Sequence, residues 1–546
     1  MLGTRERTLL LENLRPPAGY RLQRAVGTSF TLDLMALLTA PLAFTFFDAH
    51  DEDGAPLADP VALLEALRRH AEKVTLFCQA GAISVPSPDQ ILLAYLEGSV
   101  IEVEPKLGGG IFHPKVWVLN FESTEGPAIY RILCLSRNLT FARAWDTCLR
   151  LEGDLKEEGN YSRNEPFADL LLQLPGLAIR ETGPELREDL ERMADEVRQV
   201  DFKTPRPFTD FKVHSLGLSG SHVWPFPTAG RSLAISPFLA GSTVRGLVRQ
   251  HGLEVLISRP EAFADVVRRI GIEALPRTCY VLSSGAGLDA RDAEEEGEEQ
   301  PDGQPPVEDG IELSGLHAKL FLFENGPETR LFTGSANATG AAYHANVEVL
   351  VELVGKTKHC GIDALLGLEE DPKLETLRSL LQEYHPPTCP GPPPCHRELE
   401  RESDRLVRML AAVPLKATAQ HVDAEELWDI TLSGELPEIP EGPKVKVWPA
   451  TLPSKAALRI DGLGKARHES VEAAEPTDAI VTFKRMSFEA LTAFFAFEVS
   501  LQEEQCEVRQ RFAVTAELVG APENRSGCCA RSFRIATGCS NSCSSY

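Results

Sequence analysis

The chain carries two copies of one residue pattern suited to phosphate chemistry. The copies are His113-Pro-Lys115 with Ser136-Arg-Asn138, and His317-Ala-Lys319 with Gly334-Ser335-Ala-Asn337. Each places an imidazole that can act as a nucleophile two residues from a lysine. A phosphodiester requires an attacking group, an acid for the leaving oxygen and positive charge around the phosphoryl oxygens. Because two copies supply all three without a metal or cofactor, phosphodiester chemistry is the leading hypothesis.

Composition bounds the class of protein. With 546 residues we expect two to four domains, and 43% apolar with 25% charged residues is typical of a soluble globular protein. No apolar run is long enough to span a membrane, and the first residues do not resemble a signal peptide, so we expect a cytoplasmic protein. The net charge of −25 argues against nonspecific coating of nucleic acid but permits a local cationic site.

The proline-rich stretch that contains His385, Cys389, Cys395 and His396 is a candidate metal site. These are zinc-ligand types, but their setting favours a stiff linker. The cysteine- and serine-rich residues 524–546 could likewise hold a metal, although a disordered tail is the preferred interpretation. We therefore predict no metal and no cofactor.

Short apolar runs alternate with helical segments in both halves of the chain, which predicts α/β lobes with sheets buried on both faces. The expected strands are 43–47, 74–78, 100–103, 116–119, 130–135 and 148–151, then 233–235, 254–257, 278–282, 318–323, 330–332 and 347–353. Both lobes carry the histidine and serine patterns at the same place in this order, which indicates duplication.

This pattern predicts five parts. They are a first lobe over 1–205, a second over 206–360 with an acidic insertion at 285–310, a helical and proline-rich linker over 361–415, a mainly β domain over 416–523, and a tail over 524–546. The acidic insertion has two readings. It holds ten acidic residues between 289 and 309, and it is either a solvated loop or a mimic of DNA that inhibits the free protein.

The paired His-x-Lys and Ser-x-Asn patterns resemble the repeated HKD signature of the phospholipase D superfamily, over residues 25–355. The resemblance implies a fold of two pseudo-symmetric α/β lobes whose motifs meet at one active site. It also implies that one histidine attacks phosphorus to form a phosphohistidine while the other protonates the leaving oxygen. We assign His113 as the nucleophile and His317 as the acid and base, with the reverse left open.

Further roles follow from the resemblance. Lys115 and Lys319 would supply positive charge, and phosphoryl oxygens would accept hydrogen bonds from Ser136, Asn138, Ser335 and Asn337. Glu348, eleven residues after Asn337, stands where the family has the glutamate that orients a histidine. Its counterpart in the first copy is ambiguous between Asp146 and Glu152.

The first copy departs from the family pattern at two places. Asn120 stands where aspartate is usual, and Glu324 takes this place in the second copy. Cys134-Leu135 precede Ser136 where the second copy has Gly334. Near His113, the run Gly108-Gly-Gly110 is either a phosphate-cradling loop or a flexible strand entry. Phe112 and Trp145 could stack on bases, but packing is the preferred role for both.

Residues 108–117 and 135–146 resemble those of bacterial HKD-type nucleases, which implies a metal-independent DNA nuclease. Relatives of that kind often act in antiviral defence, so a helicase or ATPase partner is expected. Two alternatives stay open: a phospholipase D-type lipid hydrolase and a noncatalytic nucleic-acid-binding subunit. Because both half-sites lie in one chain, the site does not require a dimer, although a homodimer could form through the β domain.

Overall fold

The computed structural model describes thirteen segments of the chain. They are residues 10–40, 68–88, 90–106, 109–141, 144–218, 222–283, 315–368, 376–386, 394–422, 426–440, 442–461, 478–503 and 506–522. The chain divides into two compact units. The first contains Met1–Phe30, Val103–Asp302 and Gly310–Pro390, and the second contains Thr31–Glu102, Gly303–Asp309 and Gly391–Tyr546. Residues 31–102, which the sequence groups with the first lobe, belong to the second unit by this division.

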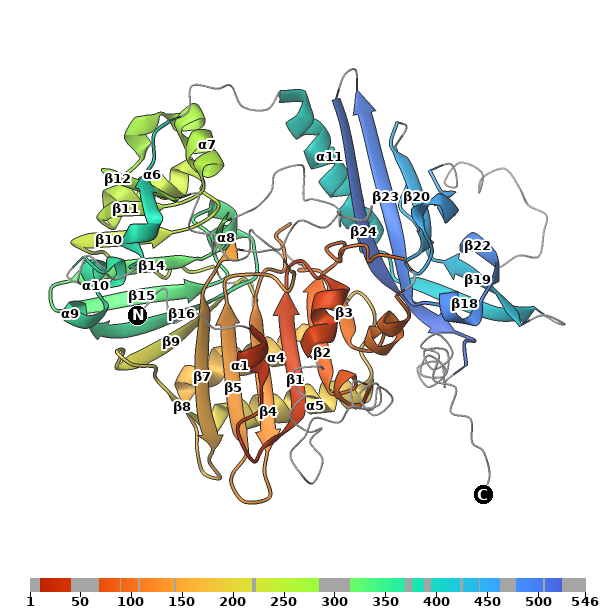
Figure 1. Cartoon of the computed structure of the whole chain (residues 1–546), viewed down its shortest axis with the longest axis horizontal. Coiled ribbons are helices and arrows are strands. Elements are labelled where there is room, and N and C mark those ends of the chain that lie inside the picture. The colour runs from red at the N-terminus through yellow and green to blue at the C-terminus, as the bar shows by residue number, and fades with distance from the viewer. Residues whose placement is uncertain are drawn as a thin grey trace, which may run out of the picture. The chain divides into compact units, whose positions relative to one another are not determined.

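One sheet of the first unit is antiparallel (Figure 1). In spatial order its strands in this unit are β1 (Arg21–Ser29), β4 (Val116–Glu122), β5 (Ile129–Leu135), β7 (Cys148–Leu155) and β8 (Val200–Lys203). The helices α4 (Glu165–Leu177) and α5 (Pro184–Arg198) lie across one face of this sheet. The short helix α1 (Leu10–Leu14) is attached through Arg131, which donates to the carbonyl oxygen of Asn13 at 2.6 Å. With both faces covered, β4 is buried over six of its seven residues, as expected for a continuous apolar strand.

The other sheet of this unit has eight strands and is mixed. In spatial order they are β17 (Leu381–Glu383), β12 (Thr278–Leu282), β11 (Leu253–Ile257), β10 (Arg231–Ile235), β14 (Leu320–Asn325), β15 (Glu328–Gly334), β16 (Glu348–Lys356) and β9 (Asp210–Leu216). The three strands β10, β11 and β12 are parallel and are connected through α6 (Gly241–Gln250) and α7 (Pro260–Ile270). The chain also forms α8 (Gly340–His344), α9 (Thr357–Cys360) and α10 (Ile362–Leu366).

The two sheets repeat one strand order. The run β1-β4-β5-β7 in the first sheet matches β10-β14-β15-β16 in the second, with antiparallel pairing throughout both runs. In each run a His-x-Lys segment leads into the second strand, and a Ser-x-Asn segment follows the third. The duplication expected from the motifs therefore has a counterpart in strand order.

Short parallel pairings connect the two runs. The strand β13 (Gly315–Leu316) pairs with β6 (Ala144–Trp145), and Phe112 forms an isolated bridge with Val347. Leu316, the residue before His317, pairs with Trp145, and Phe112, the residue before His113, pairs with Val347. We call the parts of the first unit built on the β1-β4-β5-β7 run and on the β10-β14-β15-β16 run its first and second halves. These pairings hold each histidine against the opposite half.

The second unit contains a mixed seven-stranded sheet. In spatial order its strands are β21 (Leu458–Arg459), β20 (Lys444–Pro449), β23 (Phe494–Glu503), β24 (Cys506–Val519), β18 (Leu415–Val422), β19 (Leu427–Ser433) and β22 (Ala479–Met486). The helix α11 (Pro394–Ala411) packs against β23 and β24. The strands β2 (Val74–Gln79) and β3 (Val100–Val103) fall in this unit except for Val103, the last residue of β3. Within the unit Glu102 accepts a hydrogen bond from the Thr515 amide at 2.6 Å.

The expected mixed α/β class and the β-rich C-terminal region are confirmed. The prediction missed β1 and β9, because both alternate polar with apolar residues and lack a continuous apolar run. The expected strand 43–47, the acidic segment 289–309 and the tail 524–546 lie outside the described residues. Within the described part of the chain, no helix is both long and apolar enough to cross a membrane.

Gly110 generates a prediction about how the two halves fit together. A Cβ at this position would lie 1.9 Å from the carbonyl oxygen of Ala345, so Gly110→Ala should force apart the backbones beside the Phe112–Val347 bridge. We expect a loss of about 1–3 kcal/mol of stability, measured as a lower midpoint of thermal or urea unfolding.

The matched control is Gly176→Ala in α4, where a new Cβ has no atom within 4 Å. This substitution should be neutral or stabilise the protein by less than about 1 kcal/mol. Equal unfolding midpoints for the two variants would contradict a close approach at Gly110.

Candidate active site

The four motif histidines and lysines lie at the starts of equivalent strands. His113 and Lys115 precede β4, and His317 and Lys319 precede β14. In an extended backbone, residues two apart project from the same side, so each lysine accompanies its histidine. Lys115 and Lys319 are only 2% and 1% exposed, and burial of two ammonium groups is costly unless other groups compensate them.

Glu348 provides that compensation and orients one histidine. Its carboxylate is fully buried, and its Oε2 atom lies 2.8 Å from Nδ1 of His113. The carboxylate also accepts hydrogen bonds from the Ser335 hydroxyl and, at 3.2 Å, from the Asn346 amide. Because the carboxylate accepts a hydrogen bond from the N–H at Nδ1, the lone pair of the His113 ring is on Nε2. A nucleophilic imidazole requires a free lone pair there.

The lysines are fixed by backbone carbonyl groups. Lys115 Nζ donates to the oxygen of His113 at 2.8 Å. Lys319 Nζ donates to the oxygen of His317 at 3.0 Å and to the oxygen of Ser136 at 2.8 Å. The second lysine therefore contacts the motif of the first half, which brings both copies to one site.

The two motif serines hold the turns in place. Ser136 Oγ accepts from the Thr147 amide at 2.7 Å, and Ser335 Oγ accepts from the Val349 amide at 3.0 Å. In return, the amides of Ser136 and Ser335 each donate to the carbonyl oxygens of these same residues at 3.0 Å. The expected hydrogen bonds from the serines to a phosphoryl oxygen stay a prediction.

Asn138 and Asn337 follow these serines, and their side chains are the polar groups best placed to meet a ligand. The Oδ1 atoms of both are buried and have no hydrogen-bond partner among the described residues. A buried polar atom without a partner is costly, so a bound group would be expected to complete these amides. The same feature appears at the equivalent position in both copies.

Backbone pairing resolves the counterpart of Glu348. The amide of His113 donates to the oxygen of Val347, and the amide of His317 donates to the oxygen of Trp145. The next residues are Glu348 and Asp146, so Asp146 occupies the equivalent position. Glu152 is excluded by the same register, since it lies farther along β7 and forms an ion pair with Arg131 at 2.5 Å.

Asp146 does not repeat the role of Glu348. Its nearest cation is Arg137, whose Nε lies 3.5 Å from the carboxylate, and no hydrogen bond to His317 is found among the described residues. Arg137 stands where the second copy has Ala336. Arginine at this position is one of the differences that make the two halves chemically unequal.

The departures Asn120 and Glu324 both lie away from the histidines and stabilise the fold. Asn120 donates to Tyr130 at 3.0 Å, and Glu324 accepts from the Ile362 amide at 2.7 Å and from Arg231 at 3.2 Å. Each anchors the far end of its strand. An asparagine at position 120 therefore leaves the arrangement of His113 intact.

The electrostatics of the His113 side combine burial with charge. Burial lowers the pKa of His113 to about 4, although Glu348 acts in the opposite direction. The pKa of Lys115 is lowered well below its usual value by burial and by Lys319. Burial opposes ionisation of Glu348, but His113 and Lys115 together hold its pKa below the ordinary value.

The His317 side is more positive. Burial, together with the charges of Lys319, Arg259, Lys115 and Arg137, lowers the pKa of His317 to about 3. Burial also lowers the pKa of Lys319 to about 7. Both imidazoles are therefore neutral at neutral pH, and the site is prepared to receive negative charge.

The sequence did not single out several residues that position this site. Ser29 Oγ accepts from the Leu139 amide at 3.0 Å, and Ser236 Oγ accepts from the Ala338 amide at 2.9 Å. These serines stand at equivalent ends of β1 and β10 and fix the loops after the two asparagines. Arg259 was also missed; its Nε donates to the oxygen of Leu316, next to His317, at 2.9 Å.

Other predicted features have simpler roles. Phe112 is fully buried, in line with the packing role that the sequence favoured. Trp145 is half-buried, and its carbonyl oxygen accepts hydrogen bonds from the amides of His317 and Ala318. Gly110 packs on the backbone of Ala345, which accounts for that glycine without a phosphate. Gly108 lies outside the described residues. Of the proposed zinc ligands, Cys389 also lies outside them, and His396 pairs with Glu400 at 2.7 Å.

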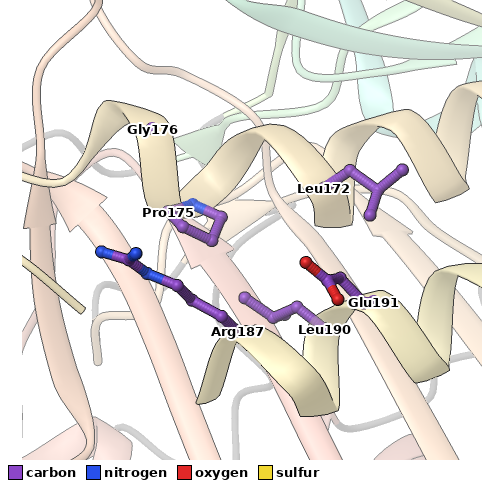
Figure 2. A pocket seen from close by; sticks show the side chains of 6 residues that line it. All are labelled: Leu172, Pro175, Gly176, Arg187, Leu190 and Glu191. Atoms are coloured by element: carbon purple, nitrogen blue, oxygen red, sulfur yellow. The ribbon is translucent and has the colours of Figure 1, made fainter. Parts of the chain in front are cut away.

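A groove elsewhere on the first unit lies between α4 and α5 (Figure 2). Its lining residues are Leu172, Pro175, Gly176, Arg187, Leu190 and Glu191. None of these six residues is a motif residue. The groove therefore adds nothing to the chemistry of the site.

Comparisons with known proteins leave the site to be judged on its own geometry. No protein-family model matches the chain, and no curated protein matches it.

The contact between His113 and Glu348 predicts a specific titration result. Because Glu348 raises the pKa of His113, Glu348→Gln should lower that pKa below about 4. The measurement is a pH titration of the histidine ring signals by NMR.

Glu352→Gln is the matched control, since Glu352 is a buried glutamate on the same strand that pairs with His214 at 2.8 Å. It should leave the His113 titration unchanged. A His113 pKa that does not respond to Glu348→Gln, or that responds equally to both substitutions, would refute the assigned contact.

Proposed function

We propose that the protein is a metal-independent phosphodiesterase of the phospholipase D type, and that its substrate is DNA. One observation carries the proposal: two His-x-Lys and Ser-x-Asn copies, 204 residues apart in sequence from His113 to His317, share one buried site. The repeated strand order of the two sheets supports the two-lobe arrangement that the resemblance implies.

In the first step, Nε2 of neutral His113 attacks phosphorus and the bond from phosphorus to the leaving oxygen breaks. His317, protonated in the reacting complex, donates its proton to that oxygen and becomes neutral, and the phosphoryl group remains on His113. Lys115 and Lys319 stabilise the charge on the phosphoryl oxygens. The contact of Glu348 with Nδ1 favours this step, because it stabilises the positive charge that develops on the attacking ring.

In the second step, His317 accepts a proton from water, and the resulting hydroxide attacks phosphorus. The bond from phosphorus to Nε2 of His113 breaks, which returns both imidazoles to their starting states. The net reaction is hydrolysis of one phosphodiester bond. His113 is favoured as the nucleophile because Glu348 orients it, whereas His317 has no equivalent carboxylate contact among the described residues.

The choice of DNA rests on the charge around His317 and on the sequence resemblance. Lys319, Arg137 and Arg259 act on His317 together, which suits a substrate with several phosphates. The net charge of −25 makes such a local cluster the expected place for DNA to bind. A helicase or ATPase partner that delivers DNA, and a role in antiviral defence, belong to the same proposal.

The first functional prediction concerns the two histidines. Wild-type protein should cleave labelled single- or double-stranded DNA in EDTA, whereas His113→Ala and His317→Ala should each lower the rate by at least about 100-fold. Only proteins that retain His113 should carry label covalently after rapid denaturation. The measurement is gel electrophoresis of both DNA and protein.

His214→Ala serves as the control, since His214 contacts Glu352 outside the site. It should retain the wild-type rate. Full EDTA-resistant cleavage by either motif variant would contradict the two-histidine mechanism, and hydrolysis of phosphatidyl substrates in place of DNA would point to a lipid phosphodiesterase.

The second functional prediction is a pH profile. The transition state holds one proton on His317, yet above pH 4 the free site has both imidazoles neutral, because their pKa values are about 4 and about 3. The value of kcat/KM should therefore fall about tenfold per pH unit from roughly pH 5 to 7. Above about pH 7 it should fall more steeply, as Lys319 loses its charge.

A bound phosphate adds negative charge and raises the pKa of His317, so kcat should stay constant to higher pH than kcat/KM. Initial rates at saturating and at low substrate separate the two quantities. If kcat/KM stays level across this range, His317 does not act as the acid.

A further inference from the structure

Phe238 is a solvent-exposed aromatic side chain on a rigid support. Its side chain is 45% exposed, although the backbone around it is tied down. Ser236 Oγ donates to the carbonyl oxygen of Phe238 at 2.8 Å and accepts from the Ala338 amide. Leu239 forms a bridge with Ala338, next to Asn337. Phe238 therefore stands beside the loop that presents one of the two site asparagines.

Arg259 connects this ring to the reaction centre. Its guanidinium carbon lies 5.0 Å from the centroid of the Phe238 ring, and the side chain is only 8% exposed. The same side chain donates to the oxygen of Leu316, the residue before His317. Arg259 therefore contacts the exposed Phe238 ring and also the backbone next to His317, and its charge acts on the imidazole of His317.

The charge beside this ring selects among ligands. A choline or ethanolamine headgroup can bind an aromatic face, but here Arg259, Lys319 and Arg137 would repel it. A planar, uncharged ring attached to a phosphate meets no such repulsion. A nucleobase fits that description, and stacking on an aromatic side chain is a common way to bind a single strand.

The matching aromatic residue of the first half, Phe30, is placed differently. Phe30 follows Ser29 as Phe238 follows Ser236 and Pro237, but the Phe30 ring packs on His113 at 5.4 Å between centroids, with Lys115 Nζ 6.0 Å from its centroid. The Phe30 ring therefore packs beside the imidazole of the proposed nucleophile, His113. Phe141, three residues after Asn138, is also exposed, at 59%, but among the described residues no arginine or lysine lies over its ring as Arg259 lies over Phe238.

We propose that Phe238 binds the base of the nucleotide on the leaving-group side of the scissile phosphate, with Arg259 supporting the ring from beneath. This inference rests on the proposed function and deepens it, because it identifies the substrate as a strand with an unpaired base at that position. It also fixes the strand's direction across the site: the phosphoryl group joins His113, and the departing nucleotide stacks beside His317.

The test uses a short single-stranded oligodeoxythymidylate that contains one tetrahydrofuran abasic residue, with cleavage positions resolved on a sequencing gel in EDTA. The abasic residue removes one base but keeps both phosphates beside it. Wild-type protein should cut one of these two phosphodiesters about tenfold more slowly than the other, because only one places the missing base on Phe238.

Phe238→Ala should cut both flanking bonds at similar rates and should cut the unmodified oligonucleotide about tenfold more slowly than wild type. Phe238→Trp should restore both the rate and the asymmetry, which separates stacking from misfolding. Leu172→Ala, at a 40% exposed apolar residue on α4, is the control and should behave as wild type.

The outcomes distinguish this inference from the proposed function. Equal cutting on both sides by wild type, or asymmetry that persists in Phe238→Ala, would overturn the stacking site while leaving a nuclease. No binding or cutting of DNA by wild type would overturn the nuclease and this inference with it. Hydrolysis of phosphatidylcholine vesicles that depends on Phe238 would assign the ring to a lipid headgroup.

Discussion

The buried carboxylate of Glu348 is the charge on which the rest of the site depends. Two lysines, each almost fully buried, are within electrostatic reach of one another and of this carboxylate. Without it, the site would hold buried positive charge that only the backbone carbonyl groups could stabilise. The same carboxylate orients His113 and is itself held by Ser335 and Asn346. Stability and chemistry are therefore tied to one side chain.

The two halves share a backbone framework but divide the chemical work. Each half contributes a lysine, an asparagine and a serine in matching positions. In the first half, the counterpart of Glu348 is Asp146, which lies beside Arg137 and has no hydrogen bond to a histidine among the described residues. One imidazole is thus matched to a carboxylate and the other to cations. An attacking imidazole is helped by a nearby carboxylate, whereas a proton donor is helped by nearby positive charge. The different surroundings of His113 and His317 meet these two opposite requirements.

Much of the fold could be predicted from continuous apolar runs, and the strand 278–282 agrees with β12 at both ends. The missed strand β1 reads Arg-Leu-Gln-Arg-Ala-Val-Gly-Thr-Ser, where charged residues interrupt the run. Because the prediction lacked β1, it also lacked the correspondence between Ser29-Phe30 after β1 and Ser236-Pro-Phe238 after β10. The motif residues were found because their spacing is local, whereas Arg259 comes from a distant helix start that no local pattern marks.

The ambiguity at Asp146 shows why spacing alone fails. Asp146 comes eight residues after Asn138, whereas Glu348 comes eleven residues after Asn337. The short helix α8 lies within the longer interval, so counting along the chain cannot align the two carboxylates. Only the hydrogen bonds of His113 with Val347 and of His317 with Trp145 establish the match.

Those two pairings also explain how a site built from distant segments can be specific. A strand pairing shifted by one residue would turn every side chain to the opposite face. A slip at Phe112 and Val347 would therefore remove His113 from Glu348 and leave both buried without a partner. Because an unpaired buried carboxylate costs several kcal/mol, the correct register is strongly favoured over its neighbours. The charges that would serve catalysis thus also select the pairing of the halves that brings them together.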